Sequence, residues 1–188
     1  MVNHDTLLLT ADMDDAAVTQ EVRRALRYFE VLTIDGDLSA DIVVAPDWIA
    51  MLAEATTLPV VAAAGPVGLR GLALLLLADF AVVGPDVTWA GGDTSPLATL
   101  ALLRLGPVGA RGFALAEDPV SHLIALGHVT TSDDPAQAVQ TAITALAPGA
   151  AHRLRQGWRA GRDLPANEAL AFAAWHFQPP AKEESDAP

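Results

Sequence analysis

Residues 58–84 read Leu58-Pro-Val-Val-Ala-Ala-Ala-Gly65, Pro66-Val-Gly-Leu-Arg-Gly71, Leu72-Ala-Leu-Leu-Leu-Leu-Ala-Asp79 and Phe80-Ala-Val-Val-Gly84. The first run is short and rich in valine and alanine, which predicts a buried strand. The Gly/Pro segment after it predicts a tight turn with close backbone approach. The apolar run closed by Asp79 predicts a buried helix, and the last run predicts a second buried strand. This order places backbone N–H groups at a helix N-terminus, where an anion or an oxyanion can be held.

The composition bounds the class of protein. The 188 residues are 52% hydrophobic, which is enough for one domain with a proper core. Eleven basic residues against 23 acidic ones give a net charge of −12, so a polyanionic ligand would need a local basic patch. Cysteine is absent, which excludes disulfides and thiolate metal sites. No signal sequence and no apolar run of roughly 20 residues is found, and we expect a cytoplasmic protein without nucleic-acid or membrane partners.

The flanking segments continue an alternation of strands and helices. A short apolar strand is expected over 6–10, an amphipathic helix over 16–30 and a strand over 31–33. Further helices are expected over 48–58, 97–105, 112–117, 134–146, 151–161 and 164–177. The sequence therefore predicts an α/β fold that ends in helices.

This order of motifs resembles the core of the crotonase (enoyl-CoA hydratase/isomerase) superfamily. The matching pieces are Ala25-Leu-Arg-Tyr-Phe-Glu30, Val31-Leu-Thr33, Pro59-Val-Val-Ala-Ala63, the turn and helix from Gly65 to Asp79, and Gly127-His-Val129. The resemblance spans roughly residues 6–178, with a shortened middle. It implies a crotonase-like ββα spiral over 1–150, a helical C-terminal region used for oligomerisation over 151–178, and a polar tail over 179–188. A homotrimer or a hexamer is the assembly that it implies.

The resemblance also implies an oxyanion hole made of two backbone N–H groups. The family's three turn glycines fall on Leu69, Arg70 and Gly71, so Arg70 takes the donor position with Gly71 beside it. The other donor is expected in the loop before Asp47, at Val43 or Val44. The alternative is that residues 41–45 form an extra strand, and the sequence leaves both interpretations open. For the Arg70 side chain, contact with an anionic ligand group and a solvent-facing turn position are also both open.

Hydratases of the family use two glutamates, and only one carboxylate remains here. The two positions fall on Ala73 and Asp93. Beside an apolar wall the Asp93 carboxyl would have a raised pKa and would serve as a general acid or base. The alternative is a turn or N-cap residue, since Asp93 follows two glycines and precedes Thr-Ser-Pro.

The ligand implied by the resemblance is an acyl thioester, carried by CoA or by the phosphopantetheine of an acyl carrier protein, with no other cofactor and no metal. Arg155 and Arg159 lie in the densest basic patch of the sequence, and they and Trp89 are the candidate ligand-binding residues. For the two arginines, a solvated helix face is the alternative. His128 is expected at the edge of the core.

Two functions are compatible with these residues. One is an enzyme in which Asp93 moves a proton while the hole holds the enolate oxygen, as in a hydratase, dehydratase or isomerase. The other is a catalytically degenerate homologue that serves as a binding or accessory subunit of a biosynthetic complex. Ala73, Arg70 and Pro46 favour the second, whereas Asp93 and Gly71 favour the first. The related Clp-type peptidases need a serine in the turn, and residues 65–72 contain none.

Overall fold

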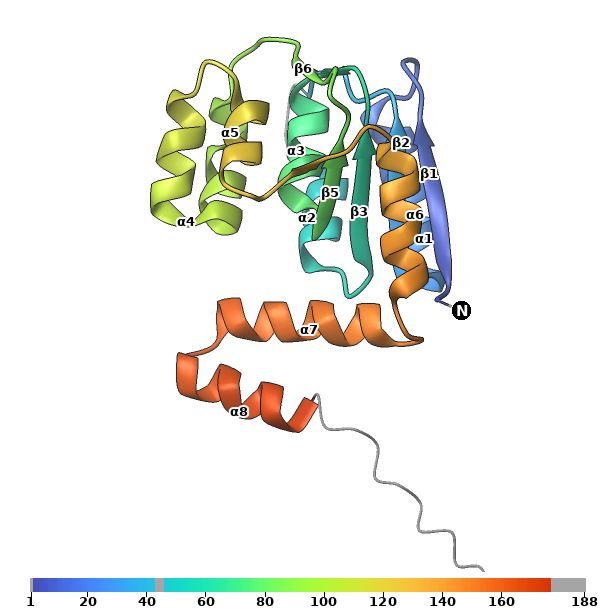
Figure 1. Ribbon diagram of the computed structural model, residues 1–188, viewed down its shortest axis with the longest axis vertical. Helices are drawn as coiled ribbons and strands as arrows, with labels where there is room; N and C mark the ends of the chain where they lie inside the picture. The colour runs from blue at the N-terminus through green and yellow to red at the C-terminus, as the bar shows by residue number, and fades with distance from the viewer. Residues whose placement is uncertain (1, 43–45, 177–188) are drawn as a thin grey trace, which may run out of the picture.

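The computed structural model describes residues 2–42 and 46–176, so the predictions for Val43 or Val44 and for the tail over 179–188 lie outside the described residues. Strands and helices alternate along the chain, as the sequence predicts (Figure 1). The elements are β1 (His4–Leu9), α1 (Asp15–Tyr28), β2 (Val31–Gly36), α2 (Asp47–Glu54), β3 (Leu58–Ala63), β4 (Pro66–Val67), α3 (Leu69–Leu77), β5 (Phe80–Val83), β6 (Thr88–Trp89), η1 (Ser95–Leu97), α4 (Ala98–Leu115), α5 (Pro119–Ala125), β7 (Thr130–Thr131), α6 (Pro135–Ala145), α7 (Ala150–Asp163) and α8 (Ala166–His176). No helix within the described ranges is both long and apolar enough to cross a membrane.

Five strands form a sheet in the order β1-β2-β3-β5-β7, and all of its neighbouring strands are parallel. The central strands β2, β3 and β5 are largely buried on both faces, because helices cover both sides of the sheet and successive side chains point to opposite sides. In β3, Val61 and Ala63 join the core that contains α1, α2 and α3, whereas Val60 and Ala62 pack on the side of α6. The short strands β4 and β6 pair separately, with Val67 opposite Trp89.

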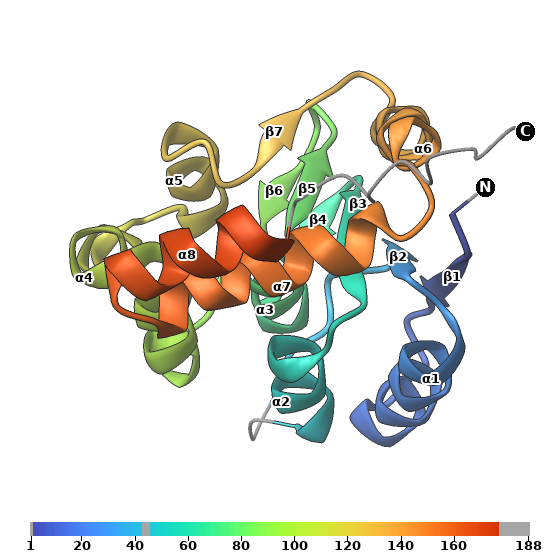
Figure 2. The ribbon, with the colours of Figure 1, turned by 90° about the horizontal axis from the view of Figure 1, so that it is seen from below.

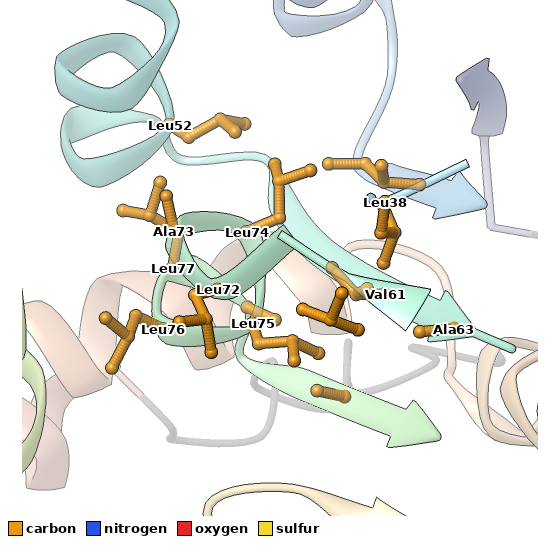
Figure 3. Close-up of a cluster of buried hydrophobic side chains, with 14 of the residues drawn as sticks. Leu38, Leu52, Val61, Ala63, Leu72, Ala73, Leu74, Leu75, Leu76 and Leu77 are labelled. Carbon is orange, nitrogen blue, oxygen red and sulfur yellow. The ribbon is translucent and has the colours of Figure 1, made fainter. Parts of the chain in front are cut away.

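Helix α3 is the centre of the larger core, because all nine of its residues are buried. Figure 3 shows its leucines packed beside Leu38, Leu52, Val61 and Ala63. The helix begins at Leu69, which is three residues before Leu72, the first residue of the apolar run that predicts it. Consequently Arg70 and Gly71 belong to its first turn rather than to a loop. The solvent-facing position considered for Arg70 is wrong, since this residue is only 3% exposed.

Helix α4 (Ala98–Leu115) consists of two helical parts, in agreement with the two pieces expected over 97–105 and 112–117, although the second part begins earlier than expected. The two parts meet at Gly106, where φ is 70°. The residue after the break is Pro107, which starts the second part as a proline at the first helical position does. Only glycine adopts this φ at little cost, so the break follows from the Gly-Pro pair.

Helices α7 and α8 cross the end of the molecule opposite the α3 N-terminus, as the two perpendicular views show (Figures 1 and 2). This is the edge at which the parallel strands begin. The candidate turn, which is the Gly/Pro segment over residues 65–71 that leads into α3, lies at the other edge, near β4 and β6 (Figure 1). The two groups of predicted site residues are therefore separated by the length of α3, about 13 Å for nine residues.

Candidate functional site

The backbone N–H groups of the turn that leads into α3 are hydrogen-bonded to another part of the same chain. Residues 38–41, which follow β2, lie against the first turn of the helix. The Gly68 N–H donates to Leu38 O at 2.9 Å, and the Arg70 N–H donates to Ala40 O at 3.0 Å. The N–H of Leu69 donates to Asp41 Oδ1 at 3.4 Å. Segment 38–41 thus accepts hydrogen bonds from Gly68, Leu69 and Arg70, whose N–H groups would otherwise be unpaired at the start of the helix.

The glycines of the turn give segment 38–41 the room to approach. A Cβ atom added at Gly68 would lie 2.1 Å from Ser39 O and 2.7 Å from Ala40 O. One added at Gly71 would lie 2.6 Å from Leu38 O. Neither residue has a positive φ that would demand glycine. Glycine is therefore needed at these two positions because segment 38–41 occupies the space that a side chain would take.

This geometry bears on the predicted oxyanion donors. The N–H of Arg70 is already hydrogen-bonded to Ala40 O, so it is not free to receive a thioester oxygen in this conformation. Segment 38–41, which supplies that carbonyl, was missed at the sequence level. Its only sequence signal is Asp37-Leu-Ser-Ala-Asp41, a composition typical of side-chain-stabilised turns. Ser39 indeed donates its N–H and its hydroxyl to Asp37 Oδ1, at 2.8 and 2.6 Å.

The Arg70 side chain turns into the protein. Its Nε lies 3.5 Å from Asp15 Oδ1, which also accepts a 3.1 Å hydrogen bond from Trp48 Nε1. Nε and Nη1 of Arg70 are buried and make no hydrogen bond to the described residues. The guanidinium also helps to lower the pKa of Asp37, after the larger contributions from the Ser39 hydrogen bonds. The Asp15 carboxylate of α1 thus links Trp48 of α2 with Arg70 of α3.

Asp93 lies on the exposed loop between β6 and η1. Its Oδ1 accepts from the N–H of Ser95 at 2.9 Å and from the Ser95 hydroxyl at 2.6 Å. These two hydrogen bonds favour the charged form and hold the pKa of Asp93 below its ordinary value. The predicted raised pKa is wrong, because the carboxylate has no apolar wall to desolvate it. The partly buried Trp89 packs against the larger core below this loop.

The edge of the sheet that carries the turn is strongly acidic. Aspartates follow the carboxyl ends of several strands: Asp12, Asp14 and Asp15 after β1, Asp37 and Asp41 after β2, Asp86 after β5, and Asp133 and Asp134 after β7. Some are structural, since Asp14 and Asp134 cap α1 and α6 by accepting from backbone N–H groups. Together they create a negative potential that opposes the binding of a polyanion such as CoA at this edge.

The two arginines predicted to bind ligand lie at the opposite edge. Arg155 on α7 is 2% exposed and donates to Leu52 O at 2.6 Å, to Ala55 O at 3.2 Å and to the Asp79 carboxylate. Arg159 donates to Glu54 O. The solvated helix face considered for Arg155 is wrong, because its guanidinium holds α7 to the core.

Asp79 is the centre of this buried network. Its carboxylate also accepts from Arg104 Nη2 at 3.0 Å, and Arg104 donates further to Leu76 O at 2.8 Å and Ala78 O at 2.9 Å. His128 lies 3.2 Å from Leu75 O. Because the end of α3 is buried, its last carbonyls need such donors. The predicted position of His128 at the edge of the core is confirmed.

The stability of this end of α3 should depend on pH through His128. Burial lowers the pKa of His128 below its ordinary value of 6.5, and Arg104 lowers it further. The unfolded chain therefore takes up this proton at a higher pH than the folded chain. We expect the free energy of unfolding to be greatest above pH 6.5 and to fall as the pH decreases from 6.5 towards the folded-state pKa. Urea unfolding at pH 7.5 and 5.5 measures this difference.

His128→Gln should reduce this pH dependence, and His152→Gln, at an exposed position on α7, should leave it unchanged. An equal slope in wild type and His128→Gln would show that another group is responsible.

Comparison with known proteins identifies the fold. No protein-family model matches the chain, and no curated relative was found. Among solved structures, an enoyl-CoA hydratase/isomerase family protein from Silicibacter pomeroyi is similar over 92% of this chain and 94% of its own, with 20% identity and a TM-score of 0.68. An enoyl-CoA hydratase from Shewanella pealeana matches 92% of this chain and 83% of its own, with 14% identity and a TM-score of 0.72.

A third structure, a putative enoyl-CoA hydratase from Streptomyces coelicolor, shares 20% identity over 93% of this chain and 82% of its own, with a TM-score of 0.69. At these identities the likeness establishes the fold. The predicted α/β crotonase spiral is confirmed.

Proposed function

We propose, from the fold that this chain shares with the enoyl-CoA hydratase/isomerase proteins, that it is a catalytically degenerate crotonase-fold protein serving as a binding or accessory subunit. The observation that carries the proposal is the hydrogen bond from the Arg70 N–H to Ala40 O. An oxyanion hole requires preorganised donors that are free to meet the developing charge. Here the N–H at the predicted donor position, that of Arg70, already donates to a carbonyl of the same chain.

The carboxylates support the same conclusion. Ala73, at the position of the first family glutamate, is buried in the core and carries no titratable group. Asp93 is exposed, and its hydrogen bonds to Ser95 stabilise the charged form. A general acid or base works best with a pKa near the working pH, and the environment of Asp93 moves its pKa in the opposite direction.

One observation favours the alternative, an enzyme that moves a proton on an acyl thioester. Asp93 follows β6, and β6 pairs with β4, the strand that leads into α3. Asp93 therefore lies at the same edge of the fold as the turn. In this second function, segment 38–41 would withdraw from the turn before a thioester oxygen could enter.

Exchange of the α-proton distinguishes the two functions, because Asp93 is exposed, so a proton that it removed from the α-carbon would exchange with D₂O and the enolate would be reprotonated with deuterium. The purified chain is incubated in D₂O with short acyl-CoAs and with acyl carrier protein thioesters, and deuterium incorporation is followed by mass spectrometry. We expect no incorporation above the protein-free rate.

Incorporation that Asp93→Asn abolishes and Asp86→Asn preserves would establish the enzyme instead. Asp86 is a suitable control because it is an exposed aspartate at the same edge of the sheet.

A further inference from the structure

A small cavity lies at the end of α3 opposite the candidate turn. It has a volume of 40 Å³, room for about three water molecules or one small tetrahedral oxyanion. Its lining residues come from three parts of the chain: Asp79, Arg104, Arg155, Trp158, Arg159 and Arg162. Trp158 is 50% exposed, so its ring stands where the cavity meets solvent.

The charges around this cavity are unbalanced. Four guanidinium groups line it, together with the single carboxylate of Asp79. Arg104 and Arg155 share that carboxylate. Outside the lining, Asp163 pairs with Arg162 through contacts of 2.6 and 3.1 Å. With both carboxylates counted, the group keeps an excess of two positive charges, in a chain whose net charge is −12.

The arginines also affect one another. Burial lowers the pKa of Arg155, Asp79 raises it again, and the nearby Arg104 and Arg159 lower it further. The guanidinium groups are therefore close enough to repel one another. An anion placed among them would remove this repulsion and would be attracted more strongly than in water, because the site is partly desolvated.

We propose that this cavity binds a phosphate-like oxyanion, held by Arg159 and by Nη1 of Arg162, the nitrogen that the contacts with Asp163 do not use, with Trp158 beside the entrance. Arginine suits this ligand because its planar fork of N–H donors matches the oxygens of a phosphate group. The site is independent of the turn at the other end of α3 and of any thioester bound there. Since Arg155 already holds α7 to the core, a bound oxyanion would further stabilise the docking of this helix.

Titration with inorganic phosphate at constant ionic strength tests the proposal. Tryptophan fluorescence and the thermal midpoint are measured while sodium chloride is replaced by sodium phosphate at pH 7. We expect a saturable change in both. Arg162→Gln should weaken phosphate binding about tenfold, because one charge-assisted contact is lost. Arg153→Gln is the matched control, since it removes the same charge from an exposed position on the same helix, away from the cavity.

Phenyl phosphate in a parallel titration distinguishes two sources of the same oxyanion. Equal affinity for both compounds identifies the free anion as the ligand. Tighter binding of phenyl phosphate, lost in Trp158→Phe, identifies an organic phosphate monoester. The proposal is overturned if phosphate produces no saturable change beyond that of chloride. It is also overturned if Arg153→Gln weakens binding as much as Arg162→Gln, because the effect would then be one of overall charge.

Discussion

Asp79→Ala is expected to destabilise the folded chain by about 3–5 kcal/mol, the cost of leaving buried cations without their partner. The Asp79 side chain is 4% exposed, and its two oxygens face Arg104 and Arg155. The arginine side chains are themselves 16% and 2% exposed, so the substitution would leave two largely buried guanidinium groups without their carboxylate. The loss also weakens the attachment of α7, which Arg155 secures.

Urea unfolding of wild type and variant at pH 7 measures this effect. Asp163→Ala serves as the control, because Asp163 also pairs with an arginine but its side chain is 50% exposed, and we expect a loss below about 1 kcal/mol. The loss of stability for Asp79→Asn should fall between those of Asp79→Ala and Asp163→Ala, since asparagine keeps the shape of the side chain and loses its charge. A loss below about 1 kcal/mol for Asp79→Ala would show that the network contributes little to stability.

Gly68→Ala is expected to cost about 1–3 kcal/mol, because the new methyl group would overlap backbone atoms that cannot move independently. The Cβ would stand 2.1 Å from Ser39 O, far inside any normal contact. The φ of Gly68 is −92°, which alanine adopts freely, so the effect measures the approach of segment 38–41 alone. Either the segment moves away from α3 or the helix start is displaced.

Gly161→Ala provides the control for this substitution. A Cβ at Gly161 meets nothing within 4 Å, and alanine is the better helix former by up to about 1 kcal/mol, so this variant should be neutral or more stable. Hydrogen exchange of the Arg70 amide gives a local measurement alongside urea unfolding. If Gly68→Ala keeps full stability and full protection of that amide, segment 38–41 does not hold the turn closed.

The sequence predicted most of the fold because local signals agree with the tertiary structure there. The strand Phe80–Val83 is found as predicted, since its apolar run is bounded by Asp79 and Gly84. The apolar run before it does form the buried central helix. The start of that helix was placed too late because residues 65–71 have a composition typical of a turn, and the partners that allow the helix to begin at Leu69 lie about 30 residues earlier.

The candidate site was predicted less completely than the fold. The resemblance to the crotonase family pointed to Arg70, Gly71 and Asp93, and all three lie at the edge of the fold that carries the turn. The resemblance could not show that Ala40 O accepts from the Arg70 N–H, because this contact depends on how closely the loop after β2 folds back. For Asp93 the sequence already offered the turn as an alternative, and its hydrogen bonds to Ser95 decide in favour of it.

The sequence by itself determined the alternation of strands and helices, the buried α3 and the absence of a carboxylate at Ala73, because each depends on the residue types within a short stretch. Only the tertiary structure decided which polar groups meet: Arg155 with Asp79, and the Arg70 N–H with Ala40 O. The physical reason is that buried donors and charges must find partners wherever the fold provides them. Here those partners lie 76 residues apart in one case and on a neighbouring loop in the other.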